Sequence, residues 1–235
     1  MKAVIKYSLH DYLRSHKYFP PISTFIILIF VYYSYTPNPI IDSYAVTSLI
    51  LYIISAWVCI SVLSLDPPVQ RQLMILHIGG ENRYYLSKLI TVLLISIILT
   101  AYAFVYPILF TMFNGSVTLT IGLVAIVNHV SLSILGICIA SFFSKIITES
   151  AVNSYGGLAL TIIISIAALG IYDALPSYLK GIVWIIPPAT ITQTPLINWD
   201  GDNVLDLSFF PFIWVIIYAL LLLYLFLKLA RRFQK

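Results

Sequence analysis

The sequence predicts an all-α polytopic membrane protein with six transmembrane helices, an N-terminal amphipathic interfacial helix and a re-entrant segment on the outer face. Composition is the first indication. Hydrophobic residues make up 60% of the 235 residues and charged residues 9%, whereas about a quarter of the residues in a soluble domain are charged. The second indication is that long apolar runs recur along the chain, with the basic residues between them. The mean hydropathy of +0.98 also indicates a membrane protein.

Six apolar runs are long enough to cross a bilayer, because a hydrocarbon core of about 30 Å requires roughly 20 apolar residues in a helix. Transmembrane strands are about half as long and alternate in polarity, which these runs do not. Residues 1–235 are therefore expected to form a single transmembrane domain. The predicted spans are 18–35, 44–65, 89–113, 117–143, 151–171 and 207–227.

The segment 1–17 has two chemically different faces. Basic side chains recur every three or four residues and share one helical face: Lys2, Lys6, His10, Arg14 and Lys17. Another face is apolar: Ile5, Leu9, Tyr12 and Leu13. This pattern is typical of a short helix that lies in the membrane interface. The alternative interpretation is a charged anchor that only orients the chain.

The connector 66–82 lies between the second and third spans and is predicted to contain a short helix. We expect Asp66 to cap a helix that begins at Pro67, because proline is tolerated at a first helical position. Gly79-Gly80 is expected to end it. Such a coupling helix would lie across the cytoplasmic mouth of the bundle and present side chains to a cytosolic partner. The alternative is an ordinary interfacial connector.

Lysine and arginine are distributed unequally between the two sides of the predicted bundle, and the side with the excess is cytoplasmic. The residues on that side are Lys2, Lys6, Arg14, Lys17, Arg71, Arg83, Lys88, Lys145, Lys228, Arg231, Arg232 and Lys235. The other side has only Lys180, and its loops carry Asp42, Asp173, Asp200, Asp202 and Asp206. Both termini are therefore expected in the cytoplasm. Because the basic residues lie beside span ends, they match anionic headgroups rather than nucleic acid.

The segment 181–198 is apolar but is broken by Pro187-Pro188 and again by Pro195. A seventh span here would place the basic C-terminus outside, against the charge rule. We expect a re-entrant or interfacial segment on the outer face. Irregular backbone at membrane depth must be buried in protein, so this segment should pack against other helices or a second subunit.

Asn128 and His129 lie near the middle of the fourth span. A charged group there costs roughly 2.5–3.5 kcal/mol on insertion scales, so His129 is expected to be neutral and hydrogen-bonded. Two interpretations stay open. These residues contact a substrate on a translocation path, or they form hydrogen bonds between helices, which are worth about 0.6 kcal/mol on average.

The sequence has no motif for catalysis or for a bound metal. Its four histidines are scattered, without His-Glu-x-x-His, and no Gly-x-x-x-x-Gly-Lys-[Ser/Thr] phosphate loop occurs. Cys59 and Cys138 lie inside apolar runs and suit helix packing. We therefore expect no catalytic residue, no metal site and no cofactor bound by this chain.

The order of elements follows a known layout. A basic amphipathic entry helix precedes two spans, a cytoplasmic helix-turn and four more spans, with a broken apolar segment before the last. The helix-turn reads Gln70-Arg71-Gln72-Leu73 … His77 … Gly79-Gly80 … Tyr84-Tyr85-Leu86-Ser87-Lys88. In this layout the chain resembles the membrane subunit of an ABC-2 type (type V) ABC exporter.

The resemblance implies a homo- or heterodimeric permease in the cell membrane of a bacterium. It also implies a separate cytoplasmic ABC ATPase, which binds ATP and Mg and docks on 66–82 and on the N-terminal helix. The residues expected to contact the ATPase are Gln70, Arg71, Leu73, Met74, Ile75, His77 and Glu81. Export, with antimicrobial and other amphipathic peptides among the substrates of small subunits of this layout, is likewise implied by the resemblance.

The spans themselves favour a hydrophobic or amphipathic substrate. Ions and sugars need polar lining to replace lost hydration, and these spans are nearly free of charge. Two other functions stay open: a membrane scaffold or immunity subunit that transports nothing, and a secondary transporter. The absence of carboxylates from the span centres weakens a proton- or sodium-coupled cycle.

Overall fold

The computed structural model describes residues 1–145, 147–148, 150–201 and 203–232. Asp202 and Lys235, used above in the charge pattern, lie outside the described residues. Apart from an isolated bridge between Asn38 and Phe113, the described residues form helices, turns and loops, which confirms the all-α class. The longer helices are α1 Lys2–Arg14, α2 Phe19–Tyr32, α3 Ile40–Leu63, α4 Pro68–Ile78, α5 Glu81–Leu109, α6 Leu119–Phe142, α7 Ala151–Ile166 and α10 Phe210–Ala230. The short ones are α8 Ala168–Ala174, η1 Lys180–Ile185, α9 Gln193–Ile197 and η2 Val204–Asp206.

Among the described residues, four helices are long and apolar enough to cross a membrane: α3, α5, α6 and α10. α7 and α8 meet at 59° and add a fifth crossing only if the bent pair is one span. α2 has 14 residues, or about 21 Å at 1.5 Å per residue, and this is shorter than the hydrocarbon core. The helices are those of a membrane protein, whereas the predicted number of six spans is not confirmed.

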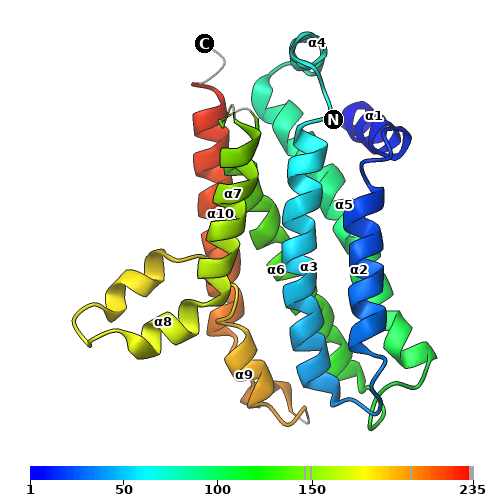
Figure 1. Cartoon of the computed structure of the whole chain (residues 1–235), viewed down its shortest axis with the longest axis vertical. Coiled ribbons are helices and arrows are strands. Elements are labelled where there is room, and N and C mark those ends of the chain that lie inside the picture. The colour runs from blue at the N-terminus through cyan, green and yellow to red at the C-terminus, as the bar shows by residue number, and fades with distance from the viewer. Residues whose placement is uncertain (146, 149, 202, 233–235) are drawn as a thin grey trace.

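The pair α3 and α6 forms the centre of the bundle (Figure 1). In α3 and in α6, 72% of the residues in the most apolar 18-residue stretch are buried inside the protein. The corresponding share is 44% in α5 and 22% in α10. Small residues allow the close approach of the two helices. A Cβ atom added at Gly136 would lie 2.5 Å from the Tyr52 carbonyl oxygen, and the Ser55 hydroxyl donates to the Ser133 carbonyl at 3.3 Å.

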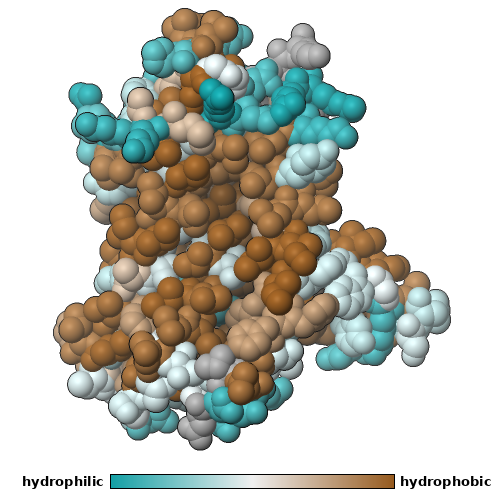
Figure 2. Space-filling view, turned by 180° about the vertical axis from the view of Figure 1, so that it is seen from behind, coloured by the Kyte–Doolittle hydropathy of each residue, from teal (hydrophilic) through white to brown (hydrophobic). Residues whose placement is uncertain are grey.

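α1 and α4 lie across one end of the bundle, together with the C-terminal end of α10 (Figure 1). We call this the terminal end and the opposite one the distal end. Figure 2 shows an apolar middle between more hydrophilic regions at the two ends. This distribution suits a protein embedded in a bilayer, where apolar side chains face the lipid chains.

The predicted N-terminal helix is confirmed as α1, but its apolar face is divided. Val4, Ser8 and Tyr12 are buried where α1 packs on α5. Leu13, expected on the same apolar face as Tyr12, is 50% exposed. Val4, Ser8 and Tyr12 therefore form the buried face of α1 that packs on α5, whereas Leu13 lies outside this contact.

After α7 the chain leaves the bundle as an arm made of α8 and η1 (Figure 1, yellow). The base of the arm is fixed to two helices. Ser165 of α7 donates to the Pro187 carbonyl at 2.6 Å, and Tyr218 of α10 donates to the Ile185 carbonyl at 2.6 Å. Pro187-Pro188 follows the end of η1 and interrupts helical structure as predicted. The predicted second break at Pro195 is wrong, because Pro195 lies within the first turn of α9, where its missing amide donor is tolerated. Re-entry of 181–198 into the membrane is not confirmed.

Candidate functional site

The helix predicted within 66–82 is confirmed as α4, and local chemistry explains its ends. Pro68 takes the first helical position after the extended Pro67, because its fixed φ already suits a helix. Gly79 ends the helix with φ 81°, and its amide donates to the Ile75 carbonyl at 3.2 Å. The glycine stop is confirmed. The predicted Asp66 cap is wrong, since Pro67 occupies the cap position without a side-chain bond.

α4 has an outward apolar stripe, which we define as Val69, Leu73 and Leu76. These side chains are 70%, 62% and 78% exposed, and their spacing of four and three residues places them on one helical face. On the other side, Met74 and Ile75 are half-buried and pack against the core. α4 therefore rests on the bundle with one apolar face and presents a second one outward.

The residues expected to contact an ATPase are divided between these faces. Leu73 and His77 are exposed, whereas Gln70, Arg71, Met74, Ile75 and Glu81 are half-buried. The Gln70 amide donates to the phenol of Tyr7, which ties α4 to α1. Burial raises the pKa of Tyr7, and the nearby carboxylates of Asp11 and Asp66 raise it further. The phenol is therefore protonated at neutral pH.

A buried ion pair joins α5 to the segment just before α4. Lys88 Nζ lies 2.7 Å from Asp66 Oδ2, and each side chain is 1% exposed. The Tyr84 hydroxyl donates to the same carboxylate oxygen, and Lys88 Nζ lies 5.7 Å from the centre of the Tyr84 ring. The sequence did not predict this pair, because Asp66 was expected to cap the helix that follows it. The available signal was an acid at the end of one apolar run and a lysine at the start of the next.

Asn128 and His129 are 1% and 0% exposed and both contact α3. Asn128 Nδ2 donates to the Ser48 hydroxyl at 2.8 Å. His129 Nε2 lies 3.1 Å from Thr47 Oγ1, and His129 Nδ1 lies 2.7 Å from the Ala125 carbonyl oxygen. Because a carbonyl only accepts, Nδ1 carries the proton of a neutral ring and Nε2 accepts from Thr47. In this conformation the two residues bind α6 to α3, and Asn128 also borders a small hollow of about 10 Å³ together with Tyr44 and Trp199.

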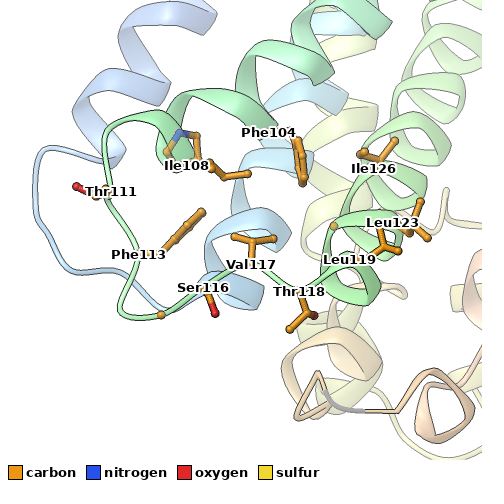
Figure 3. Close-up of a pocket in the computed structure, with 13 residues that line it drawn as sticks. Phe104, Ile108, Thr111, Phe113, Ser116, Val117, Thr118, Leu119, Leu123 and Ile126 are labelled. Carbon is orange, nitrogen blue, oxygen red and sulfur yellow. The ribbon is translucent and has the colours of Figure 1, made fainter.

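A large hollow lies at the distal end, between the C-terminal half of α5 and the N-terminal half of α6. It is a groove of about 730 Å³. Figure 3 shows the residues that enclose it. Its walls are apolar, and its hydroxyl groups come from the α5–α6 loop and its borders. The lining comprises Phe104, Pro107, Ile108, Thr111, Phe113, Gly115, Ser116, Val117, Thr118, Leu119, Gly122, Leu123 and Ile126.

The described residues contain no group of three His, Cys, Asp or Glu side chains close enough to hold a metal ion. Cys59 and Cys138 are free and buried. The Cys59 thiol lies 3.4 Å from the Ile137 carbonyl oxygen of α6. Both cysteines therefore serve helix packing in this structure.

No family model, characterised protein or solved structure matches this chain in the three comparisons made. The resemblance noted above therefore depends on the layout of the elements and on the helix-turn residues. The candidate site is defined by the chain's own geometry: the outward stripe of α4, the Lys88–Asp66 ion pair next to its N-terminal end, and the close α3–α6 contact.

Proposed function

We propose that this chain is the permease subunit of an ATP-driven exporter and that a separate ATPase binds on α4. The observation that carries the proposal is the outward stripe. Three large apolar side chains, Val69, Leu73 and Leu76, stand exposed on a helix that crosses the terminal end of the bundle. Burial of such a side chain is worth about 1.5–3 kcal/mol, so a partner that covers the stripe gains a substantial binding free energy.

A protein partner suits the stripe better than lipid does. In Figure 2 the apolar surface over α4 lies beyond hydrophilic regions of the terminal end, away from the apolar middle of the molecule. Lipid chains would contact that middle. The terminal end also carries basic side chains from α1 and α10, as the cytoplasmic side of a membrane protein does. A cytosolic partner is then the occupant that can reach α4.

The proposed topology has both termini in the cytoplasm and six crossings, made by α2, α3, α5, α6, the bent pair α7–α8, and α10. The segment 181–198 then lies on the outer face. A tilted or locally thinned bilayer accommodates the short α2 at modest cost. In this topology the distal aspartates and Lys180 lie outside, and the other basic residues lie inside.

The partner ATPase would bind the ATP and Mg. A movement of α4 would be transmitted to the spans through the segments that join α4 to its neighbouring helices. α4 is joined to α3 by residues 64–67 and to α5 by Gly79 and Gly80. The Lys88–Asp66 pair adds a buried contact beside the first joint. Because α3 and α6 are closed against each other, a hydrophobic substrate would pass along the surface of the subunit or between two subunits. The closed contact equally favours the alternative of a membrane scaffold that transports nothing.

The docking test uses the full chain co-expressed with a candidate ABC ATPase, which we expect to be encoded by a neighbouring gene. We expect Val69→Asp and Leu73→Asp to abolish co-purification, because a carboxylate would replace a buried apolar contact. Val152→Asp is the matched control: Val152 is 79% exposed, near the terminal end on α7, and its change should leave co-purification intact. An ATPase that still co-purifies with both α4 variants would refute docking on the stripe.

Transport and scaffold functions are separated by vesicles that contain both proteins. An exporter should show ATP hydrolysis stimulated by a hydrophobic or amphipathic substrate, together with movement of that substrate across the bilayer. ATP hydrolysis that no such compound stimulates would favour the scaffold. Movement in vesicles without the ATPase would favour a secondary transporter.

A further inference from the structure

The distal groove between α5 and α6 has the polarity of a site for one amphiphilic molecule. Phe104, Ile108 and Ile126 belong to its apolar walls. Ser116 and Thr118 lie at the edge toward the distal end (Figure 3). Its volume of about 730 Å³ is within the range of about 300–1,000 Å³ that small-molecule sites have. A hydrocarbon chain fits the walls, and a polar head fits the edge.

An acidic hollow adjoins this edge. It measures about 290 Å³, and Asp42, Asn114 and Asp200 are among its lining residues. The two hollows share one loop, since Phe113 lines the groove and Asn114 lines the acidic hollow. The Asp42 carboxylate has no hydrogen bond or ion pair within the described residues.

Charge selects the kind of head that this edge accepts. In the described chain Asp42, Asp200 and Asp206 lie at the distal end, whereas Asp173 of α8 and the basic Lys180 of η1 both belong to the arm. There Lys180 Nζ lies 4.4 Å from the centre of the Tyr172 ring. The field at the groove's edge is therefore negative, which attracts a cationic group and repels an anionic one.

We propose that the groove holds an acyl chain of a membrane phospholipid whose ammonium-bearing headgroup lies at Asp42. The lipid belongs to the leaflet at the distal end. Apolar walls at the depth of the hydrocarbon core take the chain, and the hydroxyl groups and carboxylates of the edge take the head. This inference does not depend on the proposed transport function, because a scaffold would bind the same lipid.

The test uses the full chain in vesicles that contain a phosphatidylethanolamine carrying a photoactivatable group on one acyl chain. After illumination we expect cross-links within residues 104–126. Ile126→Trp should abolish them by filling the groove. Ile216→Trp should leave them unchanged, because Ile216 is similarly exposed on α10, at 40% against 36% for Ile126, and does not line the groove. Elution volume and thermal unfolding establish that each variant is folded.

The headgroup is tested with the same probe on phosphatidylglycerol. We expect phosphatidylethanolamine to label 104–126 in clear preference, and Asp42→Asn to reduce that preference. Labelling of α10 and of the groove in equal yield would overturn the proposal, since it would indicate ordinary boundary lipid. Equal labelling by the two lipids would overturn the assignment of the headgroup. A disulfide-linked dimer of the Ile126→Cys variant would overturn the whole lipid proposal, because a second copy of the chain would then occupy the groove.

Discussion

Replacement of Lys88 by methionine should destabilise the protein strongly. The change keeps most of the side-chain volume but leaves the Asp66 carboxylate buried without its cation. Both side chains are 1% exposed, and Nζ and Oδ2 are 2.7 Å apart. Removal of one partner of a buried ion pair costs about 3–5 kcal/mol. The Tyr84 hydroxyl also donates to this carboxylate and offsets a part of the cost. We therefore expect Lys88→Met to lower the free energy of unfolding by about 3 kcal/mol, the lower end of that range.

The double variant Asp66→Asn/Lys88→Met separates charge from packing. It removes both charges and keeps an oxygen that can accept from Tyr84, so most of the lost stability should return. The measurement is unfolding by sodium dodecyl sulfate in mixed micelles, followed by far-ultraviolet circular dichroism. A loss below about 1 kcal/mol in Lys88→Met, typical of a solvated pair, would refute the reasoning. So would a double variant as unstable as the single one.

Three further predictions concern helix contacts and are measured by the same unfolding titration unless stated. Gly136→Ala should lower the free energy of unfolding by about 1–3 kcal/mol through overpacking, because the added Cβ would lie 2.5 Å from a carbonyl oxygen of α3. Gly156→Ala is the control, since a Cβ there meets nothing within 4 Å. Equal losses of stability in the two variants would contradict the close approach of α3 and α6. Thr47→Val removes the partner of His129 Nε2 and should cost about 0.6 kcal/mol; a loss of several kcal/mol would exclude a simple interhelical bond. Gly79→Ala forces alanine to φ 81° at a cost of about 1–2 kcal/mol, and hydrogen exchange of the α4 amides should accelerate, whereas unchanged exchange would show that the turn relaxes.

Much of the helix order could be predicted because apolar length and helix-ending residues are local properties of the sequence. Gly79 ended α4 as expected, since few other residues tolerate its positive φ. The spans at α3, α5, α6 and α10 follow from long apolar runs. The crossing number was less predictable. Whether α2 or the bent pair α7–α8 spans a bilayer depends on tilt and on neighbouring helices, which hydropathy alone does not contain.

The candidate site was predicted in composition but not in geometry. The sequence placed apolar and polar residues on one short helix, yet the choice of Leu73 as outward and Met74 as inward depends on how α4 rests on the bundle. The partner of Asp66 was missed for a similar reason. A cap is a local interaction and is readily expected, whereas the contact with Lys88 requires the spatial arrangement of two helices.

The two short joints of α4 have a mechanical consequence. A load applied to α4 enters α3 and α5 together, because only residues 64–67 and two glycines separate it from those helices. α3 is in turn locked to α6 by close backbone approach at Gly136, so these helices should respond as one stiff column. Movement would then occur mainly in the outer helices, such as α10. At the C-terminal end of α10, Arg231 Nε donates to Asn82 Oδ1 of α5 at 2.8 Å. A push at one end of the molecule would thus appear as a change of tilt among the outer helices rather than as a split through the centre.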